Sequence, residues 1–459
     1  MIKGLQEKRR NGILKVRATD TFISEMQNLS GNFLPAGTER LGRVTRVVGM
    51  TIEASGISAE IGAQCEIEIE GKHRSIDAEV IGFDGQKIVL MPVHFLDGIK
   101  AGCLVRLMHS ESSCDVGEAL LGRVVNGLGE PIDGKGDVNY ESEMPLDSHA
   151  VNPMARGAIT EVLDTGVKSI NGCLTFGKGQ RVGLIAGSGV GKSVLMAMLT
   201  RNTEADVVVI GLIGERGREV QEFVKTTLGE EGLKKAVVVA APVDLSPVMR
   251  IKAAKLTHSV AEYFSSKGKN VLLLFDSLTR VAHAQREIGL AIGEPPTTKG
   301  YTPSVFSLLP KLIERAGVGP GGVGSISAFY TVLAEGDDRT DPIVDLSRAT
   351  LDGQIMLSRT LADAAHYPAI DLEGSISRVA SSIIAADHFN AAQKLRKYWS
   401  LYVQKQDLIQ VGAYTPNTDP ELDEAIRLKP MIDEFLRQDS SEEIGMEKAI
   451  ESLQKVVAS

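Results

Sequence analysis

The sequence of 459 residues is poor in cysteine and aromatic residues, and it contains no long apolar run. Its four cysteines, Cys65, Cys103, Cys114 and Cys173, lack the spacing of metal ligands, which favours a reduced, cytosolic protein. The longest apolar stretches, such as Val207–Leu212, are far too short to cross a bilayer. The first residues contain no apolar stretch typical of a signal peptide. What remains is a globular chain long enough for two or three domains.

An excess of positive charge is missing as well. The net charge of −9 argues against simple electrostatic capture of nucleic acid. The charge is uneven, because residues 1–22 are basic whereas the C-terminal end is acidic. Each end is either a solvated surface or a partner-binding tail, and charge alone does not decide between the two.

The chain divides into three zones after residue 22. Residues 23–107 consist of short apolar runs separated by turn residues, which predicts a small antiparallel β-barrel. Residues 108–380 alternate apolar strands with helical stretches, which predicts an α/β domain with a largely parallel sheet. Residues 381–459 read as a helical domain, with Pro416 and Pro430 as helix breakers. The strands expected in the central zone are Arg181–Ala186, Val207–Ile213, Ala236–Ala240, Val271–Phe275 and Ile326–Val332.

The strongest motif is the glycine-rich run Ala186–Ser193, which follows an apolar strand and precedes a helix-like stretch. That context is typical of a phosphate-binding loop, in which backbone N–H groups and a helix N-terminus surround phosphate oxygens. Lys192 is expected to contact the β- and γ-phosphates, and Ser193 to offer its hydroxyl to Mg²⁺. The first position is Ala186, where the strict pattern has glycine. The loop residues expected to bind nucleotide are Gly187, Ser188, Gly189, Val190, Gly191, Lys192 and Ser193.

Carboxylates follow two further apolar strands. Asp276 ends the run Val271–Phe275 and fits a Walker B site that holds Mg²⁺ through water. Glu215 and Glu219 lie in the run Gly214–Glu219, four residues apart, and hydrolysis needs a carboxylate that orients the attacking water. A salt-bridged helix start explains this run equally well from its spacing.

The segment from Tyr367 to Arg378 carries an arginine whose charge suits a transferring phosphoryl group. Nothing in the local sequence assigns that role to Arg378, and a surface or ion-paired arginine is the simpler interpretation.

The order and spacing of these motifs resemble the hexameric rotary-type ATPases related to the α and β subunits of ATP synthase. Within that family the chain is most similar to the ATPases of flagellar and virulence type III protein export, and the resemblance covers nearly the whole chain. The stretches that carry it are Leu121–Asp133, Ala186–Ser193, Gly214–Glu219, Asp276–Ile288, Gly293–Pro296 and Pro368–Ser377.

Details of the motifs resemble the export branch. The loop with Ala186 looks like the export version, and Gly217 stands where the synthases have threonine. The stretches Gly300–Phe306 and Leu333–Asp338 also look like export ATPases. Ala334–Asp338 and Leu408–Tyr414 favour the flagellar member over the virulence member.

The resemblance implies a role for each matching residue. Lys192 and Ser193 match the phosphate and Mg²⁺ contacts, and Glu215 matches the carboxylate that positions water. Glu219 and Asp276 match the outer shell of the Mg²⁺ ion.

Further roles come from the same resemblance. Arg280 matches an arginine near the γ-phosphate, and Tyr367 matches the aromatic residue that stacks on adenine. Arg378 matches an arginine finger that acts on the neighbouring subunit's site. Relatives commonly carry aspartate at the position of Asn171, where we expect a local packing effect or an altered subunit contact.

The resemblance further implies a homohexamer that uses ATP and Mg²⁺ to release and unfold export substrates. Residues 1–22 would bind a stator-like regulatory protein, and the C-terminal helices would face a central stalk, chaperones and substrates at the export gate. Thr298–Thr302 either faces a central pore or forms a rigid turn between prolines. The expected location is the cytoplasm, peripherally at the inner-membrane export apparatus, without nucleic acid.

Three other functions fit the sequence less well. A proton-translocating synthase subunit usually has a loop ending in threonine, and Ser193 stands here. A hexameric RNA translocase needs stacking aromatic residues in its barrel, and residues 40–94 contain Phe83 alone. A non-catalytic nucleotide-binding subunit would lack the carboxylate of Glu215.

Overall fold

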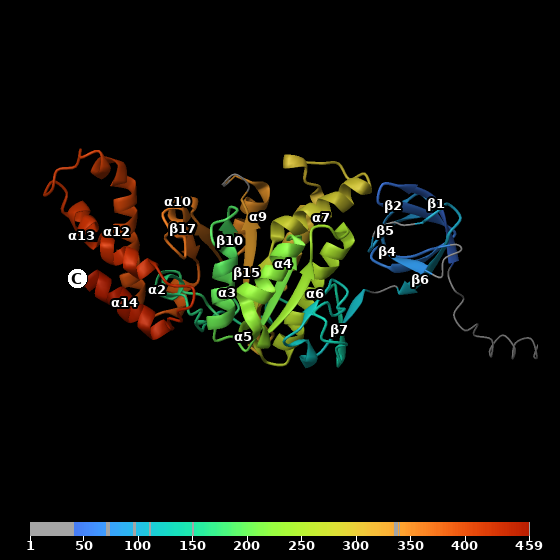
Figure 1. The fold of residues 1–459 in the computed structure, drawn as a ribbon, viewed down its shortest axis with the longest axis horizontal. Coiled ribbons are helices and arrows are strands. Elements are labelled where there is room, and N and C mark those ends of the chain that lie inside the picture. Colours follow the sequence, from blue (N-terminus) through green and yellow to red (C-terminus); the bar gives the residue numbers. More distant parts are fainter. Residues whose placement is uncertain are drawn as a thin grey trace, which may run out of the picture.

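The chain forms an elongated molecule with a barrel at one end, helices at the other and a large sheet between them (Figure 1). The computed structural model describes residues 41–69, 74–94, 98–109, 112–148, 151–334, 338 and 340–458. The expected partner-binding segment, residues 1–22, lies outside the described residues. Within the described part, the molecule has the predicted fold class: a β-barrel, an α/β domain with a largely parallel sheet, and a helical end.

Six antiparallel strands close the N-terminal barrel in the order β1-β2-β5-β4-β3-β6. Burial alternates along β3, so that every second side chain enters the barrel, as expected of a strand with one face on a core. Ile52, Ile67, Leu90 and Val105 are fully buried inside. The strands are β1 (Leu41–Val48), β2 (Thr51–Ser55), β3 (Gln64–Ile69), β4 (Arg74–Asp84), β5 (Lys87–Pro92) and β6 (Leu104–His109).

The central sheet has nine strands in the order β17-β16-β10-β15-β13-β11-β12-β8, with β14 paired to β15. All pairs are parallel except those of β14 and β17. The inner strands are continuous apolar runs because helices cover both of their faces. The strands are β8 (Val124–Val125), β10 (Arg181–Ala186), β11 (Val207–Ile213), β12 (Ala236–Ala241), β13 (Asn270–Asp276), β14 (Gly317–Val318), β15 (Ser325–Leu333), β16 (Gly353–Leu357) and β17 (Ile370–Ser377).

Two apolar cores lie on opposite faces of this sheet. Neighbouring strand residues such as Val208 and Val209 belong to different cores, which is the period-two alternation of a strand. One core packs under α6 (Pro247–Ser266), α7 (Leu278–Ala291), α8 (Pro303–Ile313) and α9 (Pro342–Thr350). The other packs under α2 (Lys168–Cys173), α3 (Lys192–Asn202) and α5 (Gly229–Lys234), and continues into the C-terminal helices.

Shorter elements complete the α/β domain. A π-helical turn over Phe223–Leu228 joins α4 to α5, and 3₁₀ turns cover Glu118–Leu120 and Thr298–Gly300. The remaining elements are β7 (Ser113–Val116), β9 (Ser142–Pro145), α4 (Gly217–Glu222), α10 (Arg359–Asp363) and α11 (Ala380–Ile383).

The C-terminal end consists of α12 (Ala386–Gln410), α13 (Pro420–Leu436) and α14 (Met446–Ala458). Pro416 lies between α12 and α13, as predicted. The prediction that Pro430 breaks a helix is wrong, because Pro430 lies inside α13. A proline inside a helix removes one backbone hydrogen bond, and the burial of Leu428 and Ile432 on either side offsets that loss. No helix in the described part of the chain is long and apolar enough to cross a membrane.

Candidate functional site

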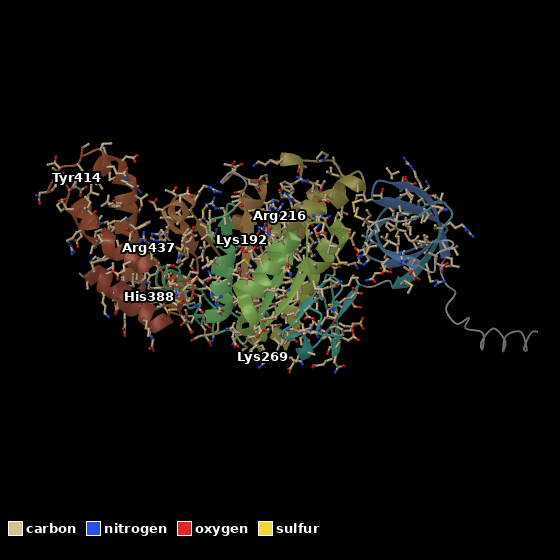
Figure 2. The ribbon with its side chains drawn as sticks, in the orientation of Figure 1. Lys192, Arg216, Lys269, His388, Tyr414 and Arg437 are labelled. Carbon is tan, nitrogen blue, oxygen red and sulfur yellow. The ribbon has the colours of Figure 1, made fainter. Side chains whose placement is uncertain are left out.

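The glycine-rich loop lies at the carboxyl end of β10, which is paired on both sides, with β15 and with β16. Gly189 and Gly191 have φ angles of 77° and 89°, a left-handed conformation that suits glycine. A Cβ atom built on Gly189 would meet no atom within 4 Å, so space is open above the loop. Figure 2 shows Lys192, which follows Gly191, in the middle of the molecule and far from Tyr414 in the connection between α12 and α13.

Helix α3 begins directly after the loop, at Lys192, and Gly191 offers its first turn no side-chain cap. The first N–H groups of a helix have no acceptor within the helix, and the helix dipole adds positive potential there. Ser193 is exposed in this first turn. The loop and helix together therefore form an anion site that suits phosphate groups.

Lys192 lies between the two carboxylates predicted for the site. Its Nζ is 2.7 Å from Oδ1 of Asp276 and 3.4 Å from Oε1 of Glu215. The three residues come from the ends of β10, β13 and β11, which run parallel and end at the same edge of the sheet. Burial alone would lower the pKa of the Lys192 ammonium, but Asp276 and Glu215 raise that pKa above its ordinary value.

Asp276 is held by a residue that the sequence analysis missed. The Thr331 hydroxyl donates a hydrogen bond of 2.5 Å to Oδ1 of Asp276, the oxygen that also faces Lys192. Thr331 is fully buried on β15. A threonine near the carboxyl end of a buried strand was the available signal, because a buried hydroxyl needs a partner.

Gly214 turns the chain at the end of β11 and directs Glu215 toward Lys192. Its φ angle is 75°, and its N–H donates to the carbonyl of Ala241. A Cβ on Gly214 would lie 2.6 Å from Cβ of Arg280, so the stem of Arg280 packs directly on the glycine. Nε of Arg280 is buried and has no hydrogen-bond partner in the described part of the chain. Glu215 and Arg280 thus follow the carboxyl ends of the adjacent strands β11 and β13, and the stem of Arg280 packs on the residue before Glu215.

Glu219 is placed differently from Glu215. It lies in the first turn of α4 and pairs with Arg216 at 3.5 Å. This ion pair is the salt-bridged helix start that the sequence analysis left open. Within the described part of the chain, Glu219 forms no ion pair with Lys192.

Tyr367 packs against the glycine-rich loop although it is far away in sequence. A Cβ on Gly191 would lie 3.2 Å from the Tyr367 ring, and 45% of Tyr367 is exposed. A second residue reaches the loop unpredicted: Arg359 donates to the carbonyl of Ser188 at 3.0 Å. Its signal was its position just after the apolar strand β16. The ring of Tyr367 is therefore available to a flat group bound beside the loop.

Arg378 lies at the opposite edge of the sheet from the loop. It follows β17, which runs antiparallel to β16, and its N–H donates to the carbonyl of Asp352. Asp352 contacts Arg181, the first residue of β10, whereas the loop follows Ala186, the last. At about 3.3 Å per residue, the length of β10 separates Arg378 from the Lys192 site in this chain.

Asn171 is a buried hub inside one chain. Its side-chain carbonyl accepts from the backbone and hydroxyl of Thr165, and its amide donates to Asp164 and to the carbonyl of Ile444. These bonds tie α2 to the segment before α14, so Asn171 acts on local packing.

The loop Thr298–Thr302 is held on both sides. Lys299 pairs with Asp338 at 2.5 Å and with Asp341 at 3.3 Å. The ring of Tyr301 is buried and stacks on His283. These contacts agree with the rigid-turn interpretation of this loop.

Fold and site together define a phosphate-loop ATPase. Family models match three parts of the chain: "ATP synthase alpha/beta family, beta-barrel domain" at residues 44–108, its "nucleotide-binding domain" at 166–377, and "T3SS EscN ATPase C-terminal domain" at 384–455. The chain belongs to the ATP synthase alpha/beta family, in the group of flagellum-specific ATP synthases and type 3 secretion system ATPases.

Individual relatives match over nearly their whole length. The chain is 54% identical to the flagellum-specific ATP synthase of Pseudomonas aeruginosa, over 91% of this chain and 93% of the relative. It is 46% identical to the type 3 secretion system ATPase of Xanthomonas euvesicatoria, over 91% and 94%. The solved structure of the assembled ATPase EscN from enteropathogenic E. coli is 42% identical, with a TM-score of 0.84 over 91% of this chain and 100% of EscN. EscN bound to its central stalk EscO gives a TM-score of 0.83 over the same shares.

The chain is therefore an ATP-hydrolysing enzyme, and the predicted flagellar-type membership is confirmed. The virulence alternative is less favoured, since the identity to the Xanthomonas enzyme is lower than that to the Pseudomonas one.

Proposed function

We propose that this chain hydrolyses MgATP at the interfaces of a homohexamer and that hydrolysis drives protein export through a flagellar-type apparatus. The observation that carries the interface model is the separation of Arg378 from its own Lys192 site by the length of β10. An arginine finger so placed can act only on a neighbouring subunit. The assembled state of EscN supports a multi-subunit enzyme.

The donor set fits ATP with Mg²⁺. The open space above Gly189, the uncapped start of α3 and the unpartnered Nε of Arg280 suit three phosphate groups. Mg²⁺ is commonly held by one or two carboxylates and the substrate phosphates, without a closed protein cage. In the described part of the chain, no group of three or more His, Cys, Asp or Glu side chains could hold a metal ion on its own. Ser193, Asp276 and Glu219 would hold the ion, which would neutralise charge on the phosphate oxygens.

Each side chain then has a part in the reaction. Glu215 orients a water molecule for in-line attack on the γ-phosphorus, and the bond to the ADP oxygen breaks. Lys192 faces two carboxylates, and the third N–H of its ammonium is available to the oxygens of the β- and γ-phosphates. Arg280 adds positive charge at the γ-phosphate, and the Tyr367 ring stacks on adenine. Charge stabilisation of this kind supplies most of the catalysis in phosphoryl transfer.

The finger makes activity depend on assembly. An arginine supplied in trans raises the rate of phosphoryl transfer by about a thousandfold or more. A separated subunit should therefore hydrolyse ATP slowly, and the hexamer rapidly.

Coupling to export rests on the family and on the shape of the chain. The EscN complex with EscO supports a central stalk as partner. The C-terminal helices would contact that stalk, export chaperones and substrates at the export gate. Residues 1–22 would bind a stator-like regulator. The enzyme would work in the cytoplasm, peripherally at the inner-membrane export apparatus.

The test is the ATPase rate against protein concentration for wild type, Glu215→Gln and Arg378→Ala. The wild-type rate per subunit should rise with concentration, and each variant alone should be nearly inactive. Mixing the two variants should restore activity, because an intact Glu215 then meets an intact Arg378 across an interface. A concentration-independent wild-type rate, or no recovery in a mixture shown to co-assemble, would remove the interface model.

A further inference from the structure

Arg378 is held in place by backbone carbonyls at the end of α9. Its Nη1 donates to the carbonyl of Leu351 at 3.2 Å and its Nη2 to that of Arg348 at 3.0 Å, while its backbone N–H donates to Asp352 at 3.0 Å. A guanidinium has five N–H groups. Within the described residues three of them have no recorded acceptor, and Arg378 is exposed. The two carbonyls therefore orient the guanidinium of Arg378, and its other N–H groups are available to a partner.

The segment that orients Arg378 is itself fixed by one ion pair. Arg181 grips the Asp352 carboxylate with two parallel bonds, Nε to Oδ2 at 3.0 Å and Nη2 to Oδ1 at 3.2 Å. The backbone N–H of Arg181 adds a third bond to Oδ2 at 3.0 Å. Such a two-point pair fixes direction as well as distance. Asp352 is the single residue between Leu351, whose carbonyl accepts from Arg378, and the start of β16. The ion pair with Arg181 therefore fixes the position of this segment.

Gln180 adds a second hold on the same residues. Its side-chain amide donates to the carbonyl of Asp352 at 3.3 Å and to the Ser377 hydroxyl at 3.1 Å. Ser377 directly precedes Arg378. Gln180, the residue before β10, and Arg181, its first residue, therefore hold Asp352 and Ser377, the two residues beside which the backbone of Arg378 is placed.

The local surroundings make this pair strong. Both side chains are mostly buried, with 16% of Arg181 and 23% of Asp352 exposed. Glu314 lies 2.8 Å from Nη1 of Arg181, on the side away from Asp352. Burial lowers the pKa of the Arg181 guanidinium, but Asp352 and Glu314 raise it above its ordinary value, so the charge is retained.

We infer that Arg181 is a positioning residue for the arginine finger, acting through Asp352 on the orientation of Arg378. This inference rests on the proposed function, in which Arg378 serves the neighbouring site. Among the described residues, the side chain of Arg181 pairs with Asp352 and Glu314, whereas that of Arg378 donates to the carbonyls of Leu351 and Arg348. It stands at the first position of the strand whose last position leads into the glycine-rich loop. One strand therefore carries both the nucleotide loop of its own site and the anchor of the finger given to the next.

A purely structural role for the pair predicts a different result. The register of β10 with β16, from Gly183 with Gln354 to Ile185 with Met356, holds the sheet without the ion pair. Loss of the two-point grip should therefore leave the sheet and the nucleotide loop in place. We expect the orientation of the Arg378 guanidinium to change, and a misplacement of about 1 Å can lower the rate up to about a hundredfold.

The first experiment measures kcat and KM for ATP in Arg181→Lys and Asp352→Asn. Both variants keep the size of the side chain and a single hydrogen bond but lose the two-point geometry. We expect kcat to fall about 10- to 100-fold, while KM for ATP and hexamer formation change less than about twofold. Glu314→Gln is the matched control, because it removes the negative charge of the other partner of Arg181 and should leave kcat within about twofold. An unchanged kcat in both variants, or an equal loss in the control, would overturn the inference.

The second experiment separates a finger defect from a defect in the chain's own site. Arg181→Lys is mixed with Glu215→Gln, whose own finger anchor is intact. If Arg181 serves the finger, the intact Glu215 of one chain meets a well-aimed Arg378 of the other, and activity exceeds the mean of the two variants alone. If Arg181 serves only its own nucleotide loop, the mixture gives no such gain, and the inference fails.

The mixture of Arg378→Ala with Glu215→Gln distinguishes failure of the positioning role of Arg181 from failure of the interface model. If that mixture recovers activity and the Arg181→Lys mixture does not, the positioning role is wrong and the interface model stands. If neither mixture recovers, the interface model fails and takes the positioning role with it.

Discussion

The ammonium of Lys192 lies 2.7 Å from a carboxylate oxygen of Asp276, and about 13% and 5% of the two side chains are exposed. Removing the ammonium leaves Asp276 and Glu215 without their shared cation. We expect Lys192→Met to abolish ATP hydrolysis and to lower the free energy of unfolding by about 1–3 kcal/mol, because buried charged groups lose a partner. Urea unfolding followed by circular dichroism measures the loss.

A second substitution tests whether the loss is electrostatic. Asp276→Asn in the Lys192→Met background removes one of the two unpaired charges, so part of the stability should return. The neighbours raise the pKa of Lys192, so its contribution is complete below its unfolded pKa of about 10.4 and is lost as pH rises through the still higher folded pKa. The difference between wild type and Lys192→Met should hence stay constant from about pH 6 to 9. Purely additive effects of Lys192→Met and Asp276→Asn on the free energy of unfolding would contradict the pairing of Lys192 with Asp276.

Gly214 offers a test of the turn that presents Glu215. Gly214→Ala places a Cβ 2.6 Å from Cβ of Arg280 at a φ angle of 75°. We expect kcat to fall about 10- to 100-fold and the free energy of unfolding to fall by about 1–3 kcal/mol. The control is Gly217→Ala, three residues later, where a Cβ meets no atom within 4 Å. Equal kcat values for the two variants would show that the turn does not set the position of Glu215.

We expect the ring of Tyr367 to contribute to the free energy of ATP binding through the base of the nucleotide. Tyr367→Ala should weaken ATP binding by about 1–3 kcal/mol, the range for stacking of a base on an aromatic ring, whereas Tyr367→Phe keeps the ring and should bind ATP nearly as wild type. Isothermal titration calorimetry with ATP and with inorganic tripolyphosphate separates the base from the phosphates. Tripolyphosphate should bind all three proteins alike, and a parallel loss for it in Tyr367→Ala would place the effect in the loop, on which Tyr367 also packs.

The inner strands could be predicted from the sequence because helices bury both of their faces, which makes them uninterrupted apolar runs. Arg181–Ala186 and Val207–Ile213 match β10 and β11 to the residue. Strands β16 and β17 were missed. Strand β17 lies at the sheet edge and its burial is irregular, whereas β16 is buried throughout but only five residues long and begins with Gly353 and Gln354. The prediction for Pro430 was wrong for a related reason. The backbone hydrogen bond that a proline removes is local in sequence, whereas the packing of α13 that offsets its loss is not visible in the nearby sequence.

In the site, too, residues in local motifs could be predicted, whereas contacts that depend on the arrangement of the strands could not. Lys192 and Asp276 could be predicted because loop and strand-end motifs are local in sequence. Thr331 could not, because its approach to Asp276 depends on the register of β13 with β15, in which Phe275 pairs with Tyr330. Arg378 and its anchor Arg181 are 197 residues apart, like Gln180 and its partner Ser377, and only the sheet order brings them together.

His258 gives a last prediction, on stability against pH. Its Nδ1 lies 2.8 Å from the carbonyl of Ala254, so Nδ1 carries the proton and Nε2 accepts from the Tyr330 hydroxyl at 3.0 Å. Burial, with help from Arg315, lowers the pKa of His258 to about 3. The unfolded chain binds this proton near pH 6.5, so the stabilisation is complete above that pH and is lost as pH falls toward 3.

The expected slope is up to about 1.4 kcal/mol per pH unit between pH 6.5 and 3. Replacing both partners, as His258→Phe with Tyr330→Phe, leaves no unpaired polar atom in the pair and should cost little at pH 7, while the acid slope becomes shallower. Free energies of unfolding in urea at pH 7, 5.5 and 4.5 measure both effects. Burial also lowers the pKa values of His366 and His388, so an unchanged slope in the double variant would show that the His258–Tyr330 pair is not the source of the acid sensitivity.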